Sequence, residues 1–212
     1  MSIIVDRFKK IKSNINKDNV NIIAVSKTYS LDYIKPLIDH GHLHFGENKV
    51  QEADSKWKSI RDTRKDLKIH LIGKLQTNKA KRALEIFDYI HSLDNQKLAD
   101  TLCKLEKVKS KKINYFIQVN VGMESQKSGI HPNELDDFYS YCSKELKLNI
   151  LGLMAIPPDD GNQEKHFKYL YETNLTLGLK HLSMGMSADY NIALKYNSTF
   201  LRIGSSIFGQ RS

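Results

Sequence analysis

The feature that most constrains this chain is a regular alternation of short apolar runs with amphipathic helical patterns. The apolar runs lie at residues 22–25, 43–45, 69–72, 89–91, 115–119, 150–154, 181–183 and 199–202. Parallel strands need long crossover connections, usually helices, so this alternation predicts an α/β fold with parallel strands. Eight strand–helix units within 212 residues predict a single (β/α)8 TIM barrel, and a doubly wound open sheet is the alternative.

The residues before the first apolar run predict one extra N-terminal helix. Its hydrophobic residues recur at helical spacing, at Ile4, Phe8, Ile11 and Ile15. Further helical stripes lie at residues 98–108, 135–146 and 167–177. Ser30, Asp94 and Ser187 stand just before predicted helices, where we expect them to act as N-caps.

Two residues bear on the helix predicted near residues 31–40. Pro36 removes a backbone donor inside it, so we expect this helix to start later or to bend. Gly41 is expected just beyond the end of the helix, where glycine is favoured. The chain contains no repeat, low-complexity stretch or linker, so residues 1–212 are predicted to form one domain.

The chain is basic, with a formal net charge of +9 and a pI of about 9.3. Its lysines are spread over the whole sequence, and the densest run, Lys104–Lys112, lies where a helix is expected to end in solvent. Nucleic-acid readers usually concentrate their charge on one face. Nucleic acid is therefore disfavoured as a partner, and an RNA-binding module is kept as the alternative from another class.

The two cysteines, Cys103 and Cys142, fall inside predicted helices and are expected to be reduced, structural thiols. The start of the chain lacks the features of a secretory signal, and its longest apolar runs, such as Ile22–Val25, are too short to cross a bilayer. We therefore expect a cytoplasmic protein that has no membrane partner.

Lys27 follows the first predicted strand, after Ser26. In a parallel α/β barrel, reactive groups collect at the carboxyl ends of the strands. Partial desolvation at this mouth would leave more of the lysine as free amine, which can attack a carbonyl to form a Schiff base. A lysine that simply extends into solvent is the alternative.

Two more strand ends carry polar side chains. Glu47 and Asn48 follow the second predicted strand, where Asn48 would bring an amide to the mouth near Lys27, and capping of the next helix is the alternative. Residues 73–78 follow the third predicted strand. They are not a Walker A loop, because Leu75 stands where that loop needs Ser or Thr.

Loops that contain Gly and Ser follow the last two predicted strands, at residues 183–187 and 202–206. Small residues let backbone N–H groups approach an anion, and a helix that starts after each loop would turn its positive end toward it. Barrels of this kind often bind phosphate at these two places. Arg202 would point into the mouth only if it met an anion or an acceptor there, and an outward salt bridge is the alternative.

The histidines do not predict a metal site. His40, His42 and His44 straddle a helix end, a turn and a strand, and no Asp or Cys cluster completes a ligand set. His70 and His91 lie on separate predicted strands and are expected to be core or rim residues.

Five segments together carry a family resemblance that runs almost from end to end. They are residues 23–28 (IAVSKT), 44–52 (HFGENKVQE), 70–79 (HLIGKLQTNK), 183–190 (SMGMSADY) and 202–209 (RIGSSIFG). With these segments the chain resembles the pyridoxal phosphate homeostasis proteins, whose barrel is similar to the N-terminal domain of the fold-type III alanine racemases. The segments at 44–52 and 183–190 are the most specific.

The resemblance implies a site for pyridoxal 5′-phosphate as cofactor at the mouth of the barrel. It implies a Schiff base on Lys27, with Asn48 near the cofactor ring and Arg202 at the pyridine nitrogen. It also implies that the phosphate lies among Ser187, Gly204 and Ser205, with Gly185 and Met186 nearby.

The resemblance also bears on function. An arginine beside the ring nitrogen opposes its protonation and makes the ring a poorer electron sink. The related racemases use a second domain and a tyrosine base from a partner subunit, both of which we expect this chain to lack. We therefore predict a monomeric carrier of pyridoxal phosphate, without catalytic residues, that could supply pyridoxal-phosphate-dependent apoenzymes. A racemase or lyase of low activity is the alternative.

Overall fold

The structure is a computed structural model that describes residues 2–15 and 17–210. Within these residues, eight strands close into a barrel in the order of the sequence. They are β1 (Asn21–Val25), β2 (His44–Glu47), β3 (Lys68–Leu71), β4 (Tyr89–Leu93), β5 (Asn114–Gln118), β6 (Asn149–Met154), β7 (His181–Met186) and β8 (Phe200–Ile203). Every neighbouring pair is parallel, and β8 pairs with β1 to close the ring. The predicted (β/α)8 barrel is confirmed, and the open sheet is excluded.

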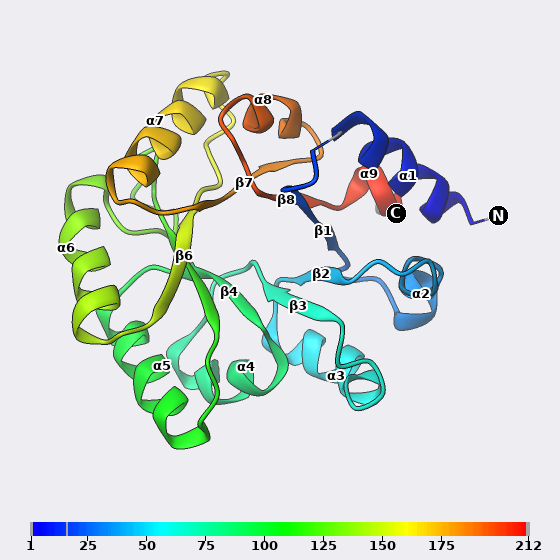
Figure 1. The fold of residues 1–212 in the computed structure, drawn as a ribbon, viewed down its shortest axis with the longest axis horizontal. Helices are drawn as coiled ribbons and strands as arrows, with labels where there is room; N and C mark the ends of the chain where they lie inside the picture. The colour runs from blue at the N-terminus through cyan, green and yellow to red at the C-terminus, as the bar shows by residue number, and fades with distance from the viewer. Residues whose placement is uncertain (1, 16, 211–212) are drawn as a thin grey trace.

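Helices surround the barrel on its outside (Figure 1). The crossovers carry α2 (Leu31–Asp39), α3 (Val50–Arg61), α4 (Ala80–Ile86), α5 (Gln96–Lys109), α6 (Leu135–Ser140), α7 (Gln163–Thr176) and α8 (Tyr190–Lys195). Short 3-10 turns, η1 (Thr77–Lys79) and η2 (Pro132–Glu134), precede α4 and α6, and the π-helical turn η3 (Tyr141–Glu145) follows α6. The last helix, α9 (Ser205–Phe208), follows β8.

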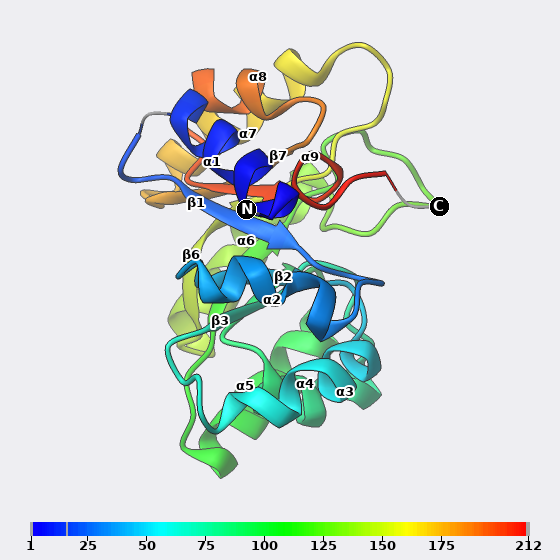
Figure 2. The ribbon, with the colours of Figure 1, turned by 90° about the vertical axis from the view of Figure 1, so that its right-hand side faces the viewer.

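The predicted N-terminal helix is α1 (Ile3–Ile15). All four residues of its predicted hydrophobic stripe are buried. Figures 1 and 2 show α1, in blue, beside α9, in red, and α1 also contacts α2. Because α2 follows β1 and α9 follows β8, the extra helix joins the helices on either side of the closure of the barrel.

Buried side chains form an outer layer and an inner layer. The outer layer lies between strands and helices and holds most of the apolar core. The inner apolar cluster is small and consists of Ile23, Phe116, Met154 and Phe200. Polar residues share the interior with it, since the rings of His70 and His91 lie 6.0 and 6.1 Å from the ring of Phe200. The apolar pattern therefore marks the outer layer better than the interior of the barrel.

The helix caps agree with the sequence at one of three predicted positions. Ser30 caps α2 and accepts a hydrogen bond from the Tyr33 amide. Asp94 was the predicted cap of α5, but the cap is Asn95, whose side chain accepts from the Leu98 amide at 2.9 Å. Ser187 is likewise not a cap, because α8 begins only at Tyr190, with Asp189 before it.

Pro36 does not delay the start of α2, which begins at Leu31 and contains the proline as its sixth residue. Pro36 stands beyond the first turn, and its carbonyl still accepts the His40 amide at the end of the helix. Gly41 adopts a φ of +89° just after the helix, as the sequence predicts.

Cys103 lies in α5 and Cys142 in the π-helical turn, and both are buried and free, as predicted. The lysine-rich run at the end of α5 is less solvated than predicted. Lys111 is half-buried and donates to the carbonyls of Leu84 and Phe87 at the end of α4. This lysine therefore ties α4 to the segment that follows α5.

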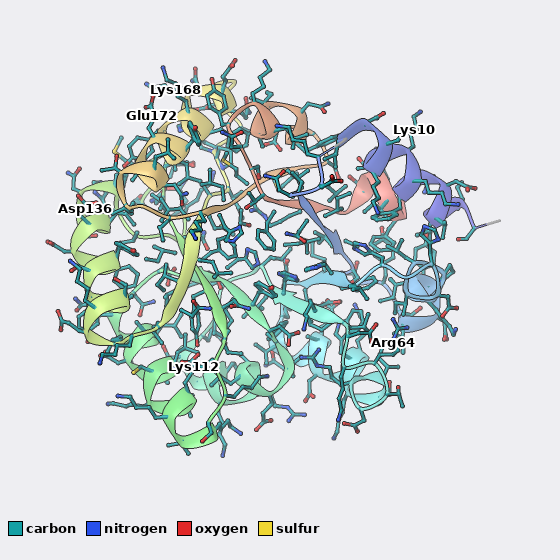
Figure 3. All side chains as sticks on the ribbon, viewed as in Figure 1. Lys10, Arg64, Lys112, Asp136, Lys168 and Glu172 are labelled. Atoms are coloured by element: carbon teal, nitrogen blue, oxygen red, sulfur yellow. The ribbon has the colours of Figure 1, made fainter. Side chains whose placement is uncertain are left out.

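Charged side chains are distributed around the outside of the molecule. Figure 3 shows Lys10, Arg64, Asp136 and the neighbouring Lys168 and Glu172 around the outside of the molecule. Several acidic and basic side chains form surface ion pairs, such as Lys35–Asp39 and Lys168–Glu172. Among the described residues, no helix is both long and apolar enough to cross a membrane.

Candidate functional site

A cavity of about 900 Å3 opens at the carboxyl ends of the strands. The arrow of β1 in Figure 2 points toward this end of the barrel, where the C-terminal segment also lies. Most of the residues proposed from sequence line the cavity, namely Lys27, Asn48, Met186, Ser187, Arg202, Gly204 and Ser205. They come from the ends of β1, β2, β7 and β8, so the closure of the barrel brings the first and last strands to one site.

Gly185 does not line this cavity. It is buried within β7 with a φ of +92°, and a Cβ there would lie 2.7 Å from the Cβ of Ala193. Glycine is needed at this point because the chain must turn tightly over α8. Gly185 therefore shapes the loop that presents Ser187.

Lys27 follows β1 on a turn with an unusual backbone. Ser26 is fully buried, whereas Thr28 has a φ of +71°, which is rare for a β-branched residue and costs about 1–2 kcal/mol. The Thr28 amide donates to the carboxylate of Glu52 on α3, and Ser26 Oγ donates to Glu47 Oε1 at 2.7 Å. The backbone is thus fastened on both sides of the lysine.

Glu47 is the centre of a buried polar cluster behind Lys27. Its Oε1 accepts hydrogen bonds from Ser26, from Lys56 Nζ at 2.8 Å and from Trp57 Nε1 at 3.1 Å. Lys56 also donates to the Ser26 carbonyl at 2.7 Å. Burial raises the pKa of Glu47, and the charge and hydrogen bond of Lys56 oppose that rise. Capping of the next helix by Glu47 is excluded, because the N-cap of α3 is Lys49, without a side-chain hydrogen bond.

Asn48 is fixed by close packing of two backbones. A Cβ on Gly73, which follows β3, would lie 2.4 Å from the backbone oxygen of Asn48. Only glycine fits there without displacing the Asn48 loop. Gly73 and Lys74 also line the cavity, so the segment after β3 contributes to the site although it is no phosphate loop of the Walker type.

The loops after β7 and β8 are joined by a hydrogen bond. The Ser206 amide donates to Ser187 Oγ at 3.3 Å. The Ser187 hydroxyl, which the sequence predicted to cap the next helix, accepts this bond from the neighbouring loop instead. A Cβ on Gly204 would lie 3.4 Å from Val25 Cβ, an ordinary van der Waals contact, so packing alone does not require glycine at this position. The helices after the two loops are only six and four residues long, so neither has a long dipole to attract an anion. The loops would instead bind an anion by letting it approach their small residues closely.

Arg202 points inward and is 3 % exposed, which excludes the outward salt bridge. Its Nη1 donates to the Ser183 carbonyl at 2.6 Å and to Ser183 Oγ at 2.8 Å, and its Nη2 donates to the Ala155 carbonyl at 2.8 Å. These acceptors are neutral, and no carboxylate of the described residues forms an ion pair with the guanidinium. Burial lowers the pKa of Arg202 to about 10, and Asp189 acts in the opposite direction from a distance.

Several polar residues that line the cavity were not singled out from the sequence. Gln118 ends β5 and donates to the Ser128 carbonyl at 3.1 Å, and Asn120 follows it. Lys127 lies on the same loop and pairs with Glu124. The carboxyl ends of all strands meet at one face of a barrel, so the position of these residues after the predicted strand at 115–119 could have identified them from the sequence.

The histidines lie away from this cavity. His70 and His91 are fully buried in the barrel, and His42 and His44 line a second hollow at its opposite, amino-terminal end. Among residues 2–15 and 17–210, no cluster of three or more potential ligands is placed to hold a metal ion.

The fold and the site together define a class: a closed barrel with a lysine after its first strand, small residues after its last two strands and a buried arginine in the last strand. A family model for the alanine racemase N-terminal domain matches residues 2–212. A pyridoxal phosphate homeostasis protein of Aquifex aeolicus is 34 % identical over 100 % of this chain and 96 % of its own length. One from Vibrio cholerae is 37 % identical over 92 % and 87 %. The chain belongs to the alanine racemase N-terminal domain family and, within it, to the pyridoxal phosphate homeostasis proteins.

Solved structures give the same relationship. PipY of Synechococcus elongatus, a structure described as having PLP bound, superposes with a TM-score of 0.90 at 33 % identity and covers 97 % of this chain and 100 % of PipY. An alanine racemase of Clostridium difficile superposes with a TM-score of 0.77 at 15 % identity and covers 98 % of this chain but 56 % of the racemase. The racemase therefore shares the fold of this barrel over about half of its own length.

Proposed function

We propose that this chain binds pyridoxal 5′-phosphate in the cavity at the carboxyl ends of the strands and takes part in the carriage and homeostasis of that cofactor in the cytoplasm. The observation that carries the proposal is that Lys27 and Arg202 line one cavity together with the joined loops of Ser187 and Ser206. An amine, a cation and an open glycine cradle fit the aldehyde, the ring nitrogen and the phosphate of this molecule.

Lys27 is the proposed covalent anchor. Its Nζ amine adds to the aldehyde carbon, and water leaves as the C=N bond of a Schiff base forms, so the step needs no oxidant or reductant. The clamped backbone at Ser26 and Thr28 holds the lysine at the cavity. When bound, the cofactor supplies a reactive aldehyde and an electron-accepting ring.

Ser187, Gly204 and Ser205 are the proposed phosphate ligands. Ser187 and Ser205 can donate hydroxyl hydrogens, and Gly204 has no Cβ, which lets an anion approach its backbone closely. We place Asn48 and Met186 beside the ring, where both line the cavity. Gly185 supports this set through the shape of its loop.

Arg202 makes carriage a better proposal than efficient catalysis. A cation that faces the pyridine nitrogen disfavours protonation there, which weakens stabilisation of a carbanion by the ring. Tyr29 is the only phenol among the described residues that line the cavity, and its hydroxyl already donates to the Gly209 carbonyl at 3.0 Å. A proton-transferring tyrosine is therefore not presented to the site by this arrangement.

The visible spectrum of the protein with pyridoxal phosphate tests the proposal. We expect a Schiff-base band that borohydride bleaches, with the reduced adduct on the Lys27 peptide by mass spectrometry. Lys27→Ala should lose both, whereas Lys74→Ala, which removes an exposed lysine from the same cavity, should keep both. An adduct that forms equally on Lys74 or Lys127 would contradict a specific anchor.

We also propose that the loaded monomer passes its cofactor to pyridoxal-phosphate-dependent apoenzymes. The expected result is recovery of an apoenzyme's activity on mixing with loaded protein, faster than with the same amount of borohydride-reduced protein. Exchange of an amino acid α-proton with solvent well above the rate of free cofactor would instead favour a racemase or lyase.

A further inference from the structure

A continuous line of hydrogen bonds crosses the interior of the barrel from Arg202 to its opposite end. Ser183 Oγ lies 2.8 Å from His91 Nδ1, His91 Nε2 lies 2.9 Å from His70 Nδ1, and His70 Nε2 lies 3.0 Å from His44 Nδ1. We call these four residues with Arg202 the histidine chain. It draws one member from each of β2, β3, β4, β7 and β8.

The two ends of the histidine chain open at different hollows. Arg202 lines the cavity of about 900 Å3 at the carboxyl ends of the strands, and His44 lines a hollow of about 300 Å3 at the amino-terminal end. Between them His70 stacks on Tyr89 at 4.2 Å and His91 on Phe116 at 4.4 Å. The imidazoles are thus oriented by aromatic faces as well as by hydrogen bonds.

Arg202 sets the polarity of the whole chain. A guanidinium can only donate, so Ser183 Oγ accepts from it. The hydroxyl hydrogen of this buried serine then has one acceptor within reach among the described residues, His91 Nδ1. His91 must carry its hydrogen on Nε2 and donate to His70 Nδ1.

The same step repeats at the next ring. His70 accepts at Nδ1, so it carries its hydrogen on Nε2 and donates to His44 Nδ1. All three imidazoles are then neutral Nε2–H tautomers, and each turns its lone pair toward Arg202. Neutrality agrees with their burial, which lowers the pKa of His70 and His91 well below the ordinary value.

We propose that Ser183, His91 and His70 are positioning residues for Arg202, which they hold as a fixed, un-neutralised cation facing the ligand. Aligned dipoles stabilise a buried charge without cancelling it, as a carboxylate would. The bonds to Ser183 and Ala155 use three of the five guanidinium N–H groups and leave two for a ligand in the cavity that Arg202 lines. This inference rests on the proposed function only in taking that ligand to be pyridoxal phosphate.

The first test reads the tautomers of the full-length protein without cofactor. Long-range 15N–1H NMR of 15N-histidine-labelled protein should show His44, His70 and His91 as Nε2–H forms. Arg202→Lys, which keeps a cationic donor, should retain the pattern, and Arg202→Met, which keeps the length but no donor, should mix the tautomers of His91 and His70. Nδ1–H forms in the wild type would overturn the proposal, whatever the protein binds.

The second test uses pyridoxal phosphate itself. His91→Phe keeps a ring against Phe116 but leaves the Ser183 hydroxyl without its acceptor, and Ser183→Ala removes the link altogether. We expect each to weaken binding by about tenfold and to shift the band of the bound cofactor. His44→Phe, at the far end, should weaken it by less than about threefold. Equal effects at all three positions would indicate a general packing role and overturn the proposal, whereas absence of any band in the wild type would count against the proposed function alone.

Discussion

At the scale of single residues, the chemistry of Lys27 depends on side chains that come from the next strand and helix. Glu47 and Lys56 hold the Ser26 side of the turn, and Glu52 holds the Thr28 amide. The left-handed conformation of Thr28 is a local cost that these contacts offset. A buried ion pair one layer behind the cavity therefore helps to position the turn that carries Lys27.

Breaking that ion pair should destabilise the protein. The side chains of Lys56 and Glu47 are 7 % and 0 % exposed, so Glu47→Gln removes the nearer carboxylate from a buried ammonium group and leaves it only Glu52 Oε1, at 3.4 Å. Because one counter-charge remains, we expect the free energy of unfolding in urea to fall by about 1–2 kcal/mol, less than for a fully unpaired buried charge. The double variant Glu47→Gln/Lys56→Met should recover part of the loss, because methionine fills similar space without a charge. A single variant as stable as the wild type would show that the pair contributes nothing.

The sequence located Lys27 and Arg202 but could not decide which way they point. Both stand near strand ends, where a shift of one residue in the pleat turns a side chain from the interior to the outside. The structure settles the direction for Arg202 through its bonds to Ser183 and Ala155. Neither acceptor could be found from sequence, since Ser183 on β7 and Ala155 after β6 come close to Arg202 only when these neighbouring strands pair in the barrel.

At the scale of elements, the sequence placed all eight strands but ended several of them two or three residues too early. The predicted segments 89–91 and 181–183 are observed as Tyr89–Leu93 and His181–Met186. β4 continues past His91 through Ser92 to Leu93, and β7 continues past Ser183 through Met184 and Gly185 to Met186. A serine interrupts the apolar run in each strand, whereas the backbone hydrogen bonds of the strand do not depend on the side chain.

Helix starts were less predictable because neighbouring polar residues compete for the cap. At the start of α5 the sequence offers Asp94 and Asn95, and the N-cap is Asn95, whose backbone is extended with ψ of 155°. At Ser187 the hydroxyl bonds across to the next loop instead, a contact that exists only after β7 and β8 have paired.

The α5 cap gives a matched pair of variants. Asn95→Ala should lower the free energy of unfolding by about 1 kcal/mol, because the Leu98 amide loses its 2.9 Å acceptor. Asp94→Ala, one residue earlier, does not remove that acceptor and should change stability by less than about 0.5 kcal/mol. Chemical denaturation of both proteins makes the comparison, and the reverse order would mean that Asp94 is the working cap.

At the scale of the whole molecule, the barrel is closed around an interior that is polar along one line. His70 and His91 take the place that branched apolar residues usually fill in such barrels. The sequence could predict the closed barrel from the number and spacing of its units. It could not predict the histidine chain, because that chain depends on how five strands are staggered around the barrel.

This interior makes the stability of the barrel depend on pH. Burial lowers the pKa of His42 to about 4 from its ordinary 6.5, and it also lowers the pKa values of His70 and His91 well below their ordinary value. When a folded-state pKa lies below the unfolded one, the unfolded chain binds more protons in between, so stability rises with pH. The stabilisation is full above about pH 6.5 and is lost as the pH falls toward 4.

His42 allows this dependence to be measured at one residue. Its shift corresponds to about 3 kcal/mol if the ring is fully shielded, and because the half-buried ring lines a hollow, we expect about 1–2 kcal/mol. His42→Gln can keep the 2.8 Å bond to the His44 carbonyl but cannot titrate. Urea unfolding of both proteins at pH 7 and pH 4 should therefore show a smaller acid loss in the variant by that amount. An equal loss in both proteins would place the acid sensitivity elsewhere, in His70 and His91 or in the carboxylates, and would mean that the hollow admits enough water to solvate a charged His42.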